Sequence, residues 1–263
     1  MTRAFRTILV STEGPVATIT MNKPERKNPL GPEMVNELCW ALDDAKDDVG
    51  VRVVVITGAG EAFSAGGDLK MMGSGPDDQG REALPPRGDY VDLLQRFTTI
   101  GKPTLARIRG VAMGGGLGLV AACDFAIAGE SAVLGTPEIK RGLFPMMIMA
   151  VLRRVVSKRR LMEMMLLGDK LDAKTAERIE LINRAVPDAS LDAEIAALAG
   201  KLAAQSPTAL RMGLAAWHAQ ADRDLASSLP FLRDQLGQIL MTEDAREGLM
   251  AFAEKREPKW TGR

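Results

Sequence analysis

Residues 104–128, TLARIRGVAMGGGLGLVAACDFAIA, hold two strand patterns separated by a glycine run and an apolar helical stretch. They predict strands at 104–109 and 124–128, with a helix from about 115 to 122 between them. A further run rich in β-branched residues at 51–57, VRVVVIT, predicts a buried strand. Alternating strands and helices of this kind are typical of parallel pairing, so we expect an α/β fold.

The first 45 residues extend this pattern. Residues 7–11 and 15–21 alternate around Gly14-Pro15 and predict a β-hairpin. Pro32 opens a stretch with apolar residues at helical spacing, which predicts a helix.

The second half of the chain is mostly helical by pattern, with one last strand predicted at 181–187. Its expected boundaries are a cap at Ser157, a stop at Gly168, a cap at Asp172, and breaks at Pro207, Pro230 and Thr242. We expect a core at 1–195 and a helical C-terminal region at 196–263.

Composition excludes several classes of function. The 263 residues include 34 Lys plus Arg and 34 Asp plus Glu, so the formal net charge is zero. Without an overall positive field, the chain is not expected to bind nucleic acid or an anionic membrane. The uncharged run at 110–123 is shorter than the roughly 18 apolar residues of a membrane span. No signal-like apolar stretch follows the N-terminus, so a cytoplasmic location is expected.

Three segments could carry chemistry: 57–70 (TGAGEAFSAGGDLK), 109–119 (RGVAMGGGLGL) and 135–145 (GTPEIKRGLFP). Small residues let a ligand approach the main chain closely, and N–H groups at a helix start can hold an anion or a developing oxyanion. Glu138 is followed by apolar residues, which would raise its pKa and suit it to proton transfer.

Each segment also has a purely structural interpretation. The first can be a tight turn with Asp68 as a cap, and Glu138 can be paired with Lys140 or Arg141. Residues 116–121, GLGLVA, match the dinucleotide fingerprint, which is a weak signal by itself. The two cysteines, Cys39 and Cys123, match no metal spacing and are expected to be small buried core residues.

In combination and order, the segments resemble the enoyl-CoA hydratase/isomerase (crotonase) family. MNKPERKNPL at 21–30 is similar to the family's N-x-P-x-x-x-N-A-L segment, with Pro29 where alanine is usual. VVVITGAGEAFSAGGDL resembles its V-V-L-T-G-x-G-x-A-F-x-A-G-x-D-[LI] stretch, and IRGVAMGGGLGLVAACDFAIA its G-x-A-x-G-G-G-x-E-L-x-x-x-C-D segment. FAEKREPKWTGR resembles the usual C-terminus.

The resemblance implies a spiral of ββα units whose core carries the CoA and active sites, with a helical C-terminal trimerisation region. The N–H groups of Gly67 and Gly115 would form an oxyanion hole for a CoA thioester carbonyl, and Glu138 would move protons. No metal or other cofactor is implied, because coenzyme A is part of the acyl-CoA substrate. The family's chemistry also implies a place in fatty acid β-oxidation.

Binding residues follow from the same resemblance. Arg26, Lys27, Ala65 and Leu69 would contact CoA within one chain. Phe252 and Lys255 would also bind CoA, but the CoA of a neighbouring subunit. The family forms homotrimers or dimers of trimers, so a homo-oligomer is expected.

Gly118 departs from the family pattern. Hydratases carry a second catalytic glutamate in G-G-G-x-E, and this chain has glycine at that position. Hydration must deliver a water as well as a proton, so another group would have to position the water. Moving a double bond from the 3 to the 2 position needs only one proton carrier. On mechanism, the missing glutamate favours isomerisation, whereas the general resemblance, above all the hydratase-like stretch TPEIKRGLFP, favours hydration. We expect an enoyl-CoA hydratase, with a Δ3-Δ2-enoyl-CoA isomerase that uses Glu138 alone as the alternative.

Two other functions stay open from the sequence. The match at residues 116–121 suggests an NAD-dependent oxidoreductase. The glycine at position 118 suggests a non-catalytic acyl-CoA binder that has lost turnover. The first predicts NAD(H) binding and the second predicts affinity for acyl-CoA without reaction.

Overall fold

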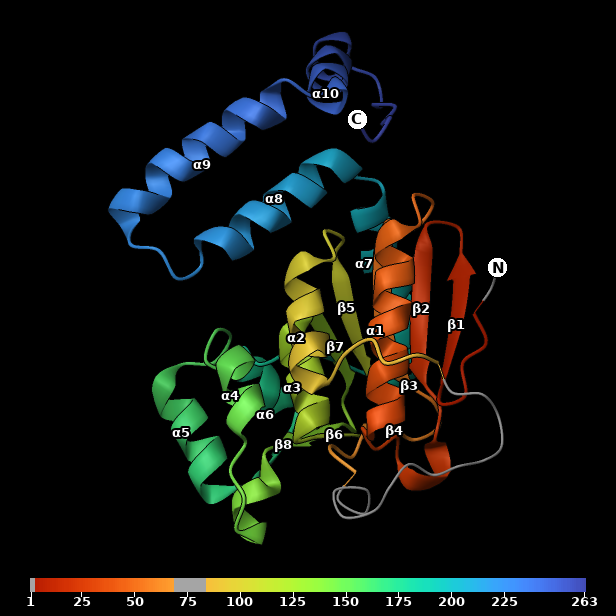
Figure 1. Ribbon diagram of the computed structural model, residues 1–263, viewed down its shortest axis with the longest axis vertical. Coiled ribbons are helices and arrows are strands. Elements are labelled where there is room, and N and C mark those ends of the chain that lie inside the picture. The colour runs from red at the N-terminus through yellow and green to blue at the C-terminus, as the bar shows by residue number, and fades with distance from the viewer. Residues whose placement is uncertain (1–2, 69–83) are drawn as a thin grey trace.

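A computed structural model describes residues 3–68 and 84–263 (Figure 1). Its larger sheet has the strand order β1-β2-β3-β5-β7-β10. β1 and β2 pair antiparallel, and the following neighbours are all parallel. The strands are β1 (Ile8–Glu13), β2 (Val16–Met21), β3 (Val53–Gly58), β5 (Thr104–Ile108), β7 (Phe125–Gly129) and β10 (Arg184–Val186).

A smaller sheet of short strands lies below the larger one in Figure 1. Its order is β4-β6-β8-β9, with β4, β6 and β8 parallel and β9 antiparallel to β8. The strands are β4 (Ala62–Ser64), β6 (Val111–Met113), β8 (Val133–Gly135) and β9 (Lys170–Asp172). These four strands were not predicted, because each has three residues and shows no periodic pattern by itself. β10 is equally short but lies within the longer stretch 181–187 that was predicted as a strand.

Helices cover both faces of the larger sheet. The first half of the chain supplies α1 (Pro32–Asp47), α2 (Tyr90–Thr99) and α3 (Gly115–Ala122). Further along come α4 (Met146–Leu152), α5 (Lys158–Leu167), α6 (Ala173–Arg178) and α7 (Leu191–Ala203). The described part of the chain also forms the short 3-10 helices η1 (Pro24–Arg26), η2 (Pro137–Arg141) and η3 (Asp188–Ser190).

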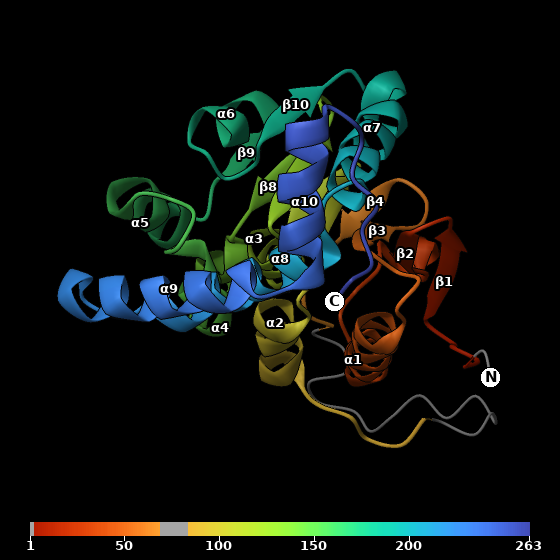
Figure 2. The ribbon, with the colours of Figure 1, turned by 90° about the horizontal axis from the view of Figure 1, so that it is seen from above.

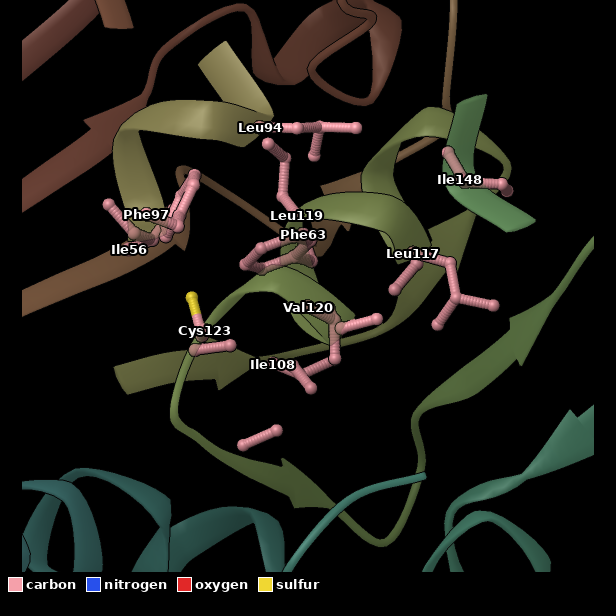
Figure 3. Packing of buried hydrophobic residues seen from close by; sticks show 14 of the residues in the cluster. Ile56, Phe63, Leu94, Phe97, Ile108, Leu117, Leu119, Val120, Cys123 and Ile148 are labelled. Atoms are coloured by element: carbon pink, nitrogen blue, oxygen red, sulfur yellow. The ribbon is translucent and has the colours of Figure 1, made fainter. Parts of the chain in front are cut away.

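The main core lies between α1, α2, α3 and the two sheets. Phe63 of β4 is fully buried and is drawn beside Leu119 of α3 in Figure 3. A second cluster fills the opposite face of the larger sheet, where Leu191 and Ile195 of α7 pack against Val55. Both faces of the parallel strands are therefore covered, which explains the continuous apolar run of β3.

Three C-terminal helices stand apart from the sheets at one end of the molecule (Figures 1 and 2). They are α8 (Pro207–Gln220), α9 (Leu225–Leu240) and α10 (Glu243–Glu254). The predicted boundary at 195/196 falls inside α7, which packs on the larger sheet. The division into a core and a helical region stays a prediction.

The predicted α/β pattern is confirmed. The hairpin, the buried strand β3 and the helix after Pro32 lie where they were expected, and α3 covers the predicted range. Asp172 caps α6 by accepting from the Thr175 N–H. Gly168 ends α5 in the left-handed conformation, with φ +64°.

One boundary prediction was wrong, and one predicted cap stands at the expected residue without a side-chain hydrogen bond. Pro230 lies inside α9 and does not break it. Its ring removes one hydrogen bond to the Ala226 carbonyl, which lies at an exposed position where water can replace it. Ser157 precedes α5 but makes no capping hydrogen bond; it is exposed, so water can satisfy the first-turn N–H groups.

Candidate active site

The three chemically suggestive segments meet at one edge of the smaller sheet. Met113 of β6 is in register with Gly135 of the parallel strand β8, and β4 flanks β6 on the other side. The carboxyl ends of these parallel strands lead to Gly67, Gly115 and Glu138. Ligand sites of α/β sheets lie at this end of the strands, so the strand topology explains why the segments converge.

The Gly67 peptide is held by the residue opposite it. Leu30 donates its N–H to the Gly66 carbonyl at 2.8 Å, and its carbonyl accepts from the Asp68 N–H at 3.2 Å. Leu30 and Gly67 thus form a parallel bridge, in which Leu30 makes both of its hydrogen bonds to the residues on either side of Gly67. The N–H of Gly67 therefore points away from Leu30, on the exposed side of the turn.

Gly115 is the first residue of α3 and lies beside Gly67. The N–H groups of a first helical turn have no partner within the helix, and the helix dipole makes this end positive. A Cβ on Gly115 would lie 3.6 Å from the Gly67 nitrogen. At Gly66, with φ +97°, a Cβ would come within 2.8 Å of the Met113 carbonyl oxygen. The two turns can approach this closely only because glycines form them.

Glu138 lies on η2 with its carboxylate against the same turn. A Cβ on Gly114 would be 2.8 Å from Glu138 Oε1. Within the described residues, the buried Glu138 Oε2 has no hydrogen-bond partner. Burial raises the pKa of Glu138, while the nearby charge of Arg141 acts in the opposite direction. Lys140 binds Asp169 at 2.7 Å instead, so the ion-pair interpretation of Glu138 is not supported.

Position 118 has no room for a side chain. A Cβ on Gly118 would overlap the hydroxyl of Tyr90 and Cγ2 of Ile148. Tyr90 Oη donates to the Gly115 carbonyl at 2.6 Å. Tyr90 was missed in the sequence because it stands in no motif. Its proximity to the site follows only from the packing of α2 against α3.

The glycines that match the dinucleotide fingerprint serve the packing of α3. A Cβ on Gly116 would lie 2.6 Å from the Ser64 Cβ, and position 118 is filled as described. Both residues are buried. The match at 116–121 is therefore explained by the close approach of α3 to β4 and α4, which removes the observation behind the NAD-dependent alternative.

Of the four residues predicted to bind CoA within one chain, Arg26 and Lys27 lie at the end of η1 and Ala65 follows β4. Arg26 pairs with Asp68 at 2.8 Å, and the carbonyl of the exposed Lys27 accepts from the Ala65 N–H at 2.8 Å. Ala65 is exposed two residues before Gly67. Leu69 lies outside the described residues. The structure thus brings three of the four beside the Gly67 turn.

Asn28 is a positioning residue whose role the sequence did not reveal. It is fully buried with φ +52°, and its side-chain amide donates to the Ala59 and Ala62 carbonyls at 3.0 and 2.8 Å. Its own carbonyl accepts from the Ser64 hydroxyl at 2.7 Å. Asn28 therefore fixes the 21–30 segment to the turn around β4. The motif similarity at 21–30 was the only signal of its importance.

Phe252 and Lys255 are not brought to this site within one chain. Both are at the end of α10, at the opposite end of the molecule from β4, β6 and β8 in Figure 1. Phe252 is 86% exposed, and Lys255 ends the helix in the left-handed conformation. Their predicted approach to a CoA would require a second subunit.

Residues 3–68 and 84–263 give little support for metal binding, cysteine chemistry or a membrane-spanning helix. These residues contain no group of three or more His, Cys, Asp or Glu side chains placed to hold a metal ion. Cys39 and Cys123 are buried and free, as predicted, and burial raises the pKa of Cys39 to about 11. No helix in this part of the chain is both long and apolar enough to span a membrane.

Comparisons with known proteins agree with this geometry. A family model described as enoyl-CoA hydratase/isomerase matches residues 11–263. A putative enoyl-CoA hydratase of Thermus thermophilus is 36% identical over 94% of this chain and 98% of its own length. A probable enoyl-CoA hydratase of Rhizobium meliloti is 36% identical over 99% and 100%.

Solved structures give the same result. An enoyl-CoA hydratase from Mycobacterium smegmatis superposes with a TM-score of 0.89 at 34% identity, covering 97% of this chain and 99% of that one. An enoyl-CoA hydratase from Bacillus anthracis also gives 0.89, at 31% identity over 98% and 100%. The crotonase-like α/β fold class is thereby confirmed.

Proposed function

The chain belongs to the enoyl-CoA hydratase/isomerase family, whose members are lyases or isomerases, and from that premise we propose that it is an enoyl-CoA hydratase. It adds water across the 2,3 double bond of an acyl-CoA thioester, or removes it. One observation carries the proposal. The outward N–H of Gly67 and the first N–H of α3 lie beside the carboxylate of Glu138, whose Oε2 has no hydrogen-bond partner among the described residues.

In the proposed reaction, the thioester oxygen accepts hydrogen bonds from the N–H groups of Gly67 and Gly115. Glu138 takes a proton from water, and the water oxygen bonds to C3. The electron pair of the double bond moves toward the thioester oxygen and gives an enolate. Glu138 then returns the proton to C2. Main-chain donors of this kind typically stabilise such an oxyanion by about 3–4 kcal/mol each.

The raised pKa of Glu138 suits both halves of this cycle. A carboxylate with an ordinary pKa is a weak base near neutral pH, whereas burial makes the Glu138 carboxylate a stronger base and its acid form easier to retain. No metal ion or redox cofactor is needed, because the charge that develops is on an oxygen held by two N–H donors.

Isomerisation is the second candidate, and Gly118 is the observation that raises it. A single carboxylate can remove a proton from one carbon and return it to another. The relatives favour hydration, since those of Thermus thermophilus and Rhizobium meliloti are both named as hydratases. Hydration is therefore the reaction we propose for this chain.

We assign CoA binding to Arg26, Lys27 and Ala65 beside the Gly67 turn, to Leu69, and across a subunit boundary to Phe252 and Lys255. We also propose a homotrimer or a dimer of trimers, as the family resemblance implies, and exposed apolar residues on α9 and α10 could supply subunit contacts. They include Leu225, Leu229, Leu236, Leu240, Leu249 and Phe252. The predicted cytoplasmic location and role in β-oxidation stay predictions.

The first experiment distinguishes the two candidate reactions. The protein is incubated with a 2-enoyl-CoA and, separately, with a 3-enoyl-CoA in ¹⁸O-labelled water, and the products are weighed by mass spectrometry. Hydration adds one labelled water to the 2-enoyl-CoA. An isomerised 3-enoyl-CoA product, with no label gained from either substrate, would assign the isomerase instead.

The second experiment tests the proton carrier. Glu138→Gln keeps the shape of the side chain but removes its basicity, so hydration should fall at least about a thousandfold, while acyl-CoA binding measured by calorimetry persists. Glu130→Gln is the matched control, because Glu130 is an exposed glutamate after β7 that pairs with Lys174. Full activity in Glu138→Gln would refute the assignment. Binding without turnover in the unaltered protein would instead favour the non-catalytic acyl-CoA binder.

A further inference from the structure

The space beside Gly118 is filled by a polar group. Where a side chain at 118 would begin, the structure has the hydroxyl of Tyr90 and a methyl group of Ile148. Hydration by one carboxylate leaves a second requirement, which is a partner for the other hydrogen of the attacking water. The hydroxyl of Tyr90 is the polar side-chain atom that occupies this position.

The local structure fixes the Tyr90 hydroxyl in this position. Tyr90 is the first residue of α2, directly after a reciprocal capping box between Asp89 and Asp92. Its hydroxyl donates its single hydrogen to the Gly115 carbonyl at 2.6 Å. A phenol has one hydrogen to donate but can also accept, so the lone pairs of Tyr90 Oη remain for a donor in the site.

The same hydroxyl lies close to the other groups of the site. Tyr90 Oη and the Gly67 nitrogen are each 3.6 Å from the position of a Cβ on Gly115. Glu138 Oε1 lies 2.8 Å from the corresponding position on the preceding residue, Gly114. Burial and the negative charge of Glu138 both raise the pKa of Tyr90, so the phenol keeps its hydrogen at neutral pH.

We propose that Tyr90 is the positioning residue for the attacking water, in the place that Gly118 leaves without a side chain. The water donates one hydrogen to Tyr90 Oη and the other to the Glu138 carboxylate, which directs a lone pair of its oxygen at C3. Glu138 takes the proton, the C3–O bond forms, and the proton later returns to C2. Tyr90 exchanges no proton. This inference rests on the proposed hydratase function.

The test uses Tyr90→Phe, which removes one oxygen and keeps the ring. Two reactions are measured on the full-length protein. One is hydration of crotonyl-CoA, which needs a positioned water. The other is exchange of the C2 hydrogens of butanoyl-CoA in D2O, followed by NMR, which needs Glu138 and the N–H donors but adds no water.

Tyr90→Phe should lower kcat for hydration by 10- to 100-fold and change KM by less than about threefold, because the acyl-CoA contacts persist. The C2 exchange rate should stay within about twofold of the unaltered protein. Ile148→Val is the matched control, since it lines the same space without a polar atom; it should leave both rates within about twofold. Thermal unfolding of each variant checks that the fold is kept.

Two results in Tyr90→Phe would overturn the inference and leave the hydratase proposal intact. Unchanged hydration means that the water has another partner. An equal loss of hydration and exchange means that the hydroxyl only supports the structure of the site. Failure of the proposed function is seen separately, in the unaltered protein, as C2 exchange without any hydration of crotonyl-CoA.

Discussion

Several glycines of the smaller sheet and α3 are crowded, whereas two glycines of the C-terminal helices are not. A Cβ on Gly110, just before β6, or on Gly118 would overlap neighbouring atoms, and one on Gly116 would lie 2.6 Å from Ser64, although Gly67 has an open Cβ position. In the C-terminal helices, Gly213 and Gly237 have no neighbouring atom within 4 Å of a Cβ position. Glycine in the first region permits close contact between backbones, whereas in the second it only weakens a helix. Residue type alone therefore does not reveal which glycines belong to the site.

The largest effect is expected at Gly110. Gly110→Ala would place a methyl group against the Glu61 carbonyl oxygen at a φ of +59°. Steric overlap and backbone strain together should lower the free energy of unfolding by about 3 kcal/mol. Urea denaturation measures this loss. Gly14→Ala is the control for strain alone, because Gly14 has φ +54° and an open Cβ position; it should cost about 1 kcal/mol. Equal losses at the two positions would show that crowding is unimportant.

Gly118→Ala should have the next largest effect. The methyl group would displace Tyr90 or Ile148, at a cost of about 1–3 kcal/mol in the free energy of unfolding. If Tyr90 moves, hydration of crotonyl-CoA should fall about tenfold while C2 exchange of butanoyl-CoA is largely kept. Gly116→Ala crowds Ser64 instead and should affect both reactions equally. Selective loss of hydration in Gly116→Ala, and not in Gly118→Ala, would contradict the placement of Tyr90.

Carboxylates of the two regions should respond to pH in opposite ways. Burial raises the pKa of Glu138, so its ionised form is disfavoured in the folded state, and the stability of the protein falls as the pH rises through that raised pKa. Hydrogen bonds from Arg256 and the Lys259 N–H lower the pKa of Glu247 to about 2. Glu247 therefore contributes stability above its ordinary pKa of 4.5, and this is lost as the pH falls toward 2.

Thermal unfolding at several pH values tests this contrast. Glu138→Gln should unfold at an equal or higher temperature than the unaltered protein at pH 8. Glu247→Gln should unfold at a lower temperature at pH 7 but not at pH 2. In activity assays, the acid limb of the pH profile for hydration should have its midpoint above the ordinary glutamate value of 4.5. A midpoint at or below this value would argue against a buried Glu138 base.

The smallest effect is expected in the C-terminal helices. Gly213→Ala in α8 and Gly237→Ala in α9 should each raise the free energy of unfolding by about 0.5–1 kcal/mol, because alanine loses less backbone entropy than glycine on forming a helix. Chemical denaturation of the two variants measures the gain. A loss of stability at either site would indicate that a partner surface needs the glycine there.

Much of the fold could be predicted because local patterns and tertiary packing agree. The glycine run before Leu117 and the apolar residues after it specify α3, and the β-branched run of β3 is buried on both faces. The smaller sheet could not be predicted, since its strands are three residues long and depend on pairing for their conformation. Pro230 was misleading because one missing hydrogen bond at an exposed position does not end a helix.

The site was predictable where it is built from main chain and not where it depends on packing. The segments around Gly67, Gly115 and Glu138 were found, since each follows a strand and carries a motif. Tyr90 was not, because it stands in no motif and the sequence around it does not indicate which residues it approaches in space. Gly118 indicated only that the second catalytic glutamate of the family pattern is missing. What replaces a side chain there depends on the placement of α2 and α4.

The bridge between Leu30 and Gly67 has a consequence for how this chain can diverge. The two proposed oxyanion donors belong to the backbone, so no exchange of side chains removes them except a change to proline, which lacks the N–H. An insertion or deletion that shifts the register near residue 30 or residue 115 would remove them at once. Point mutations can therefore change the acid–base groups while the two N–H donors stay in place. This makes the scaffold tolerant of new reactions but intolerant of changes in the length of its turns.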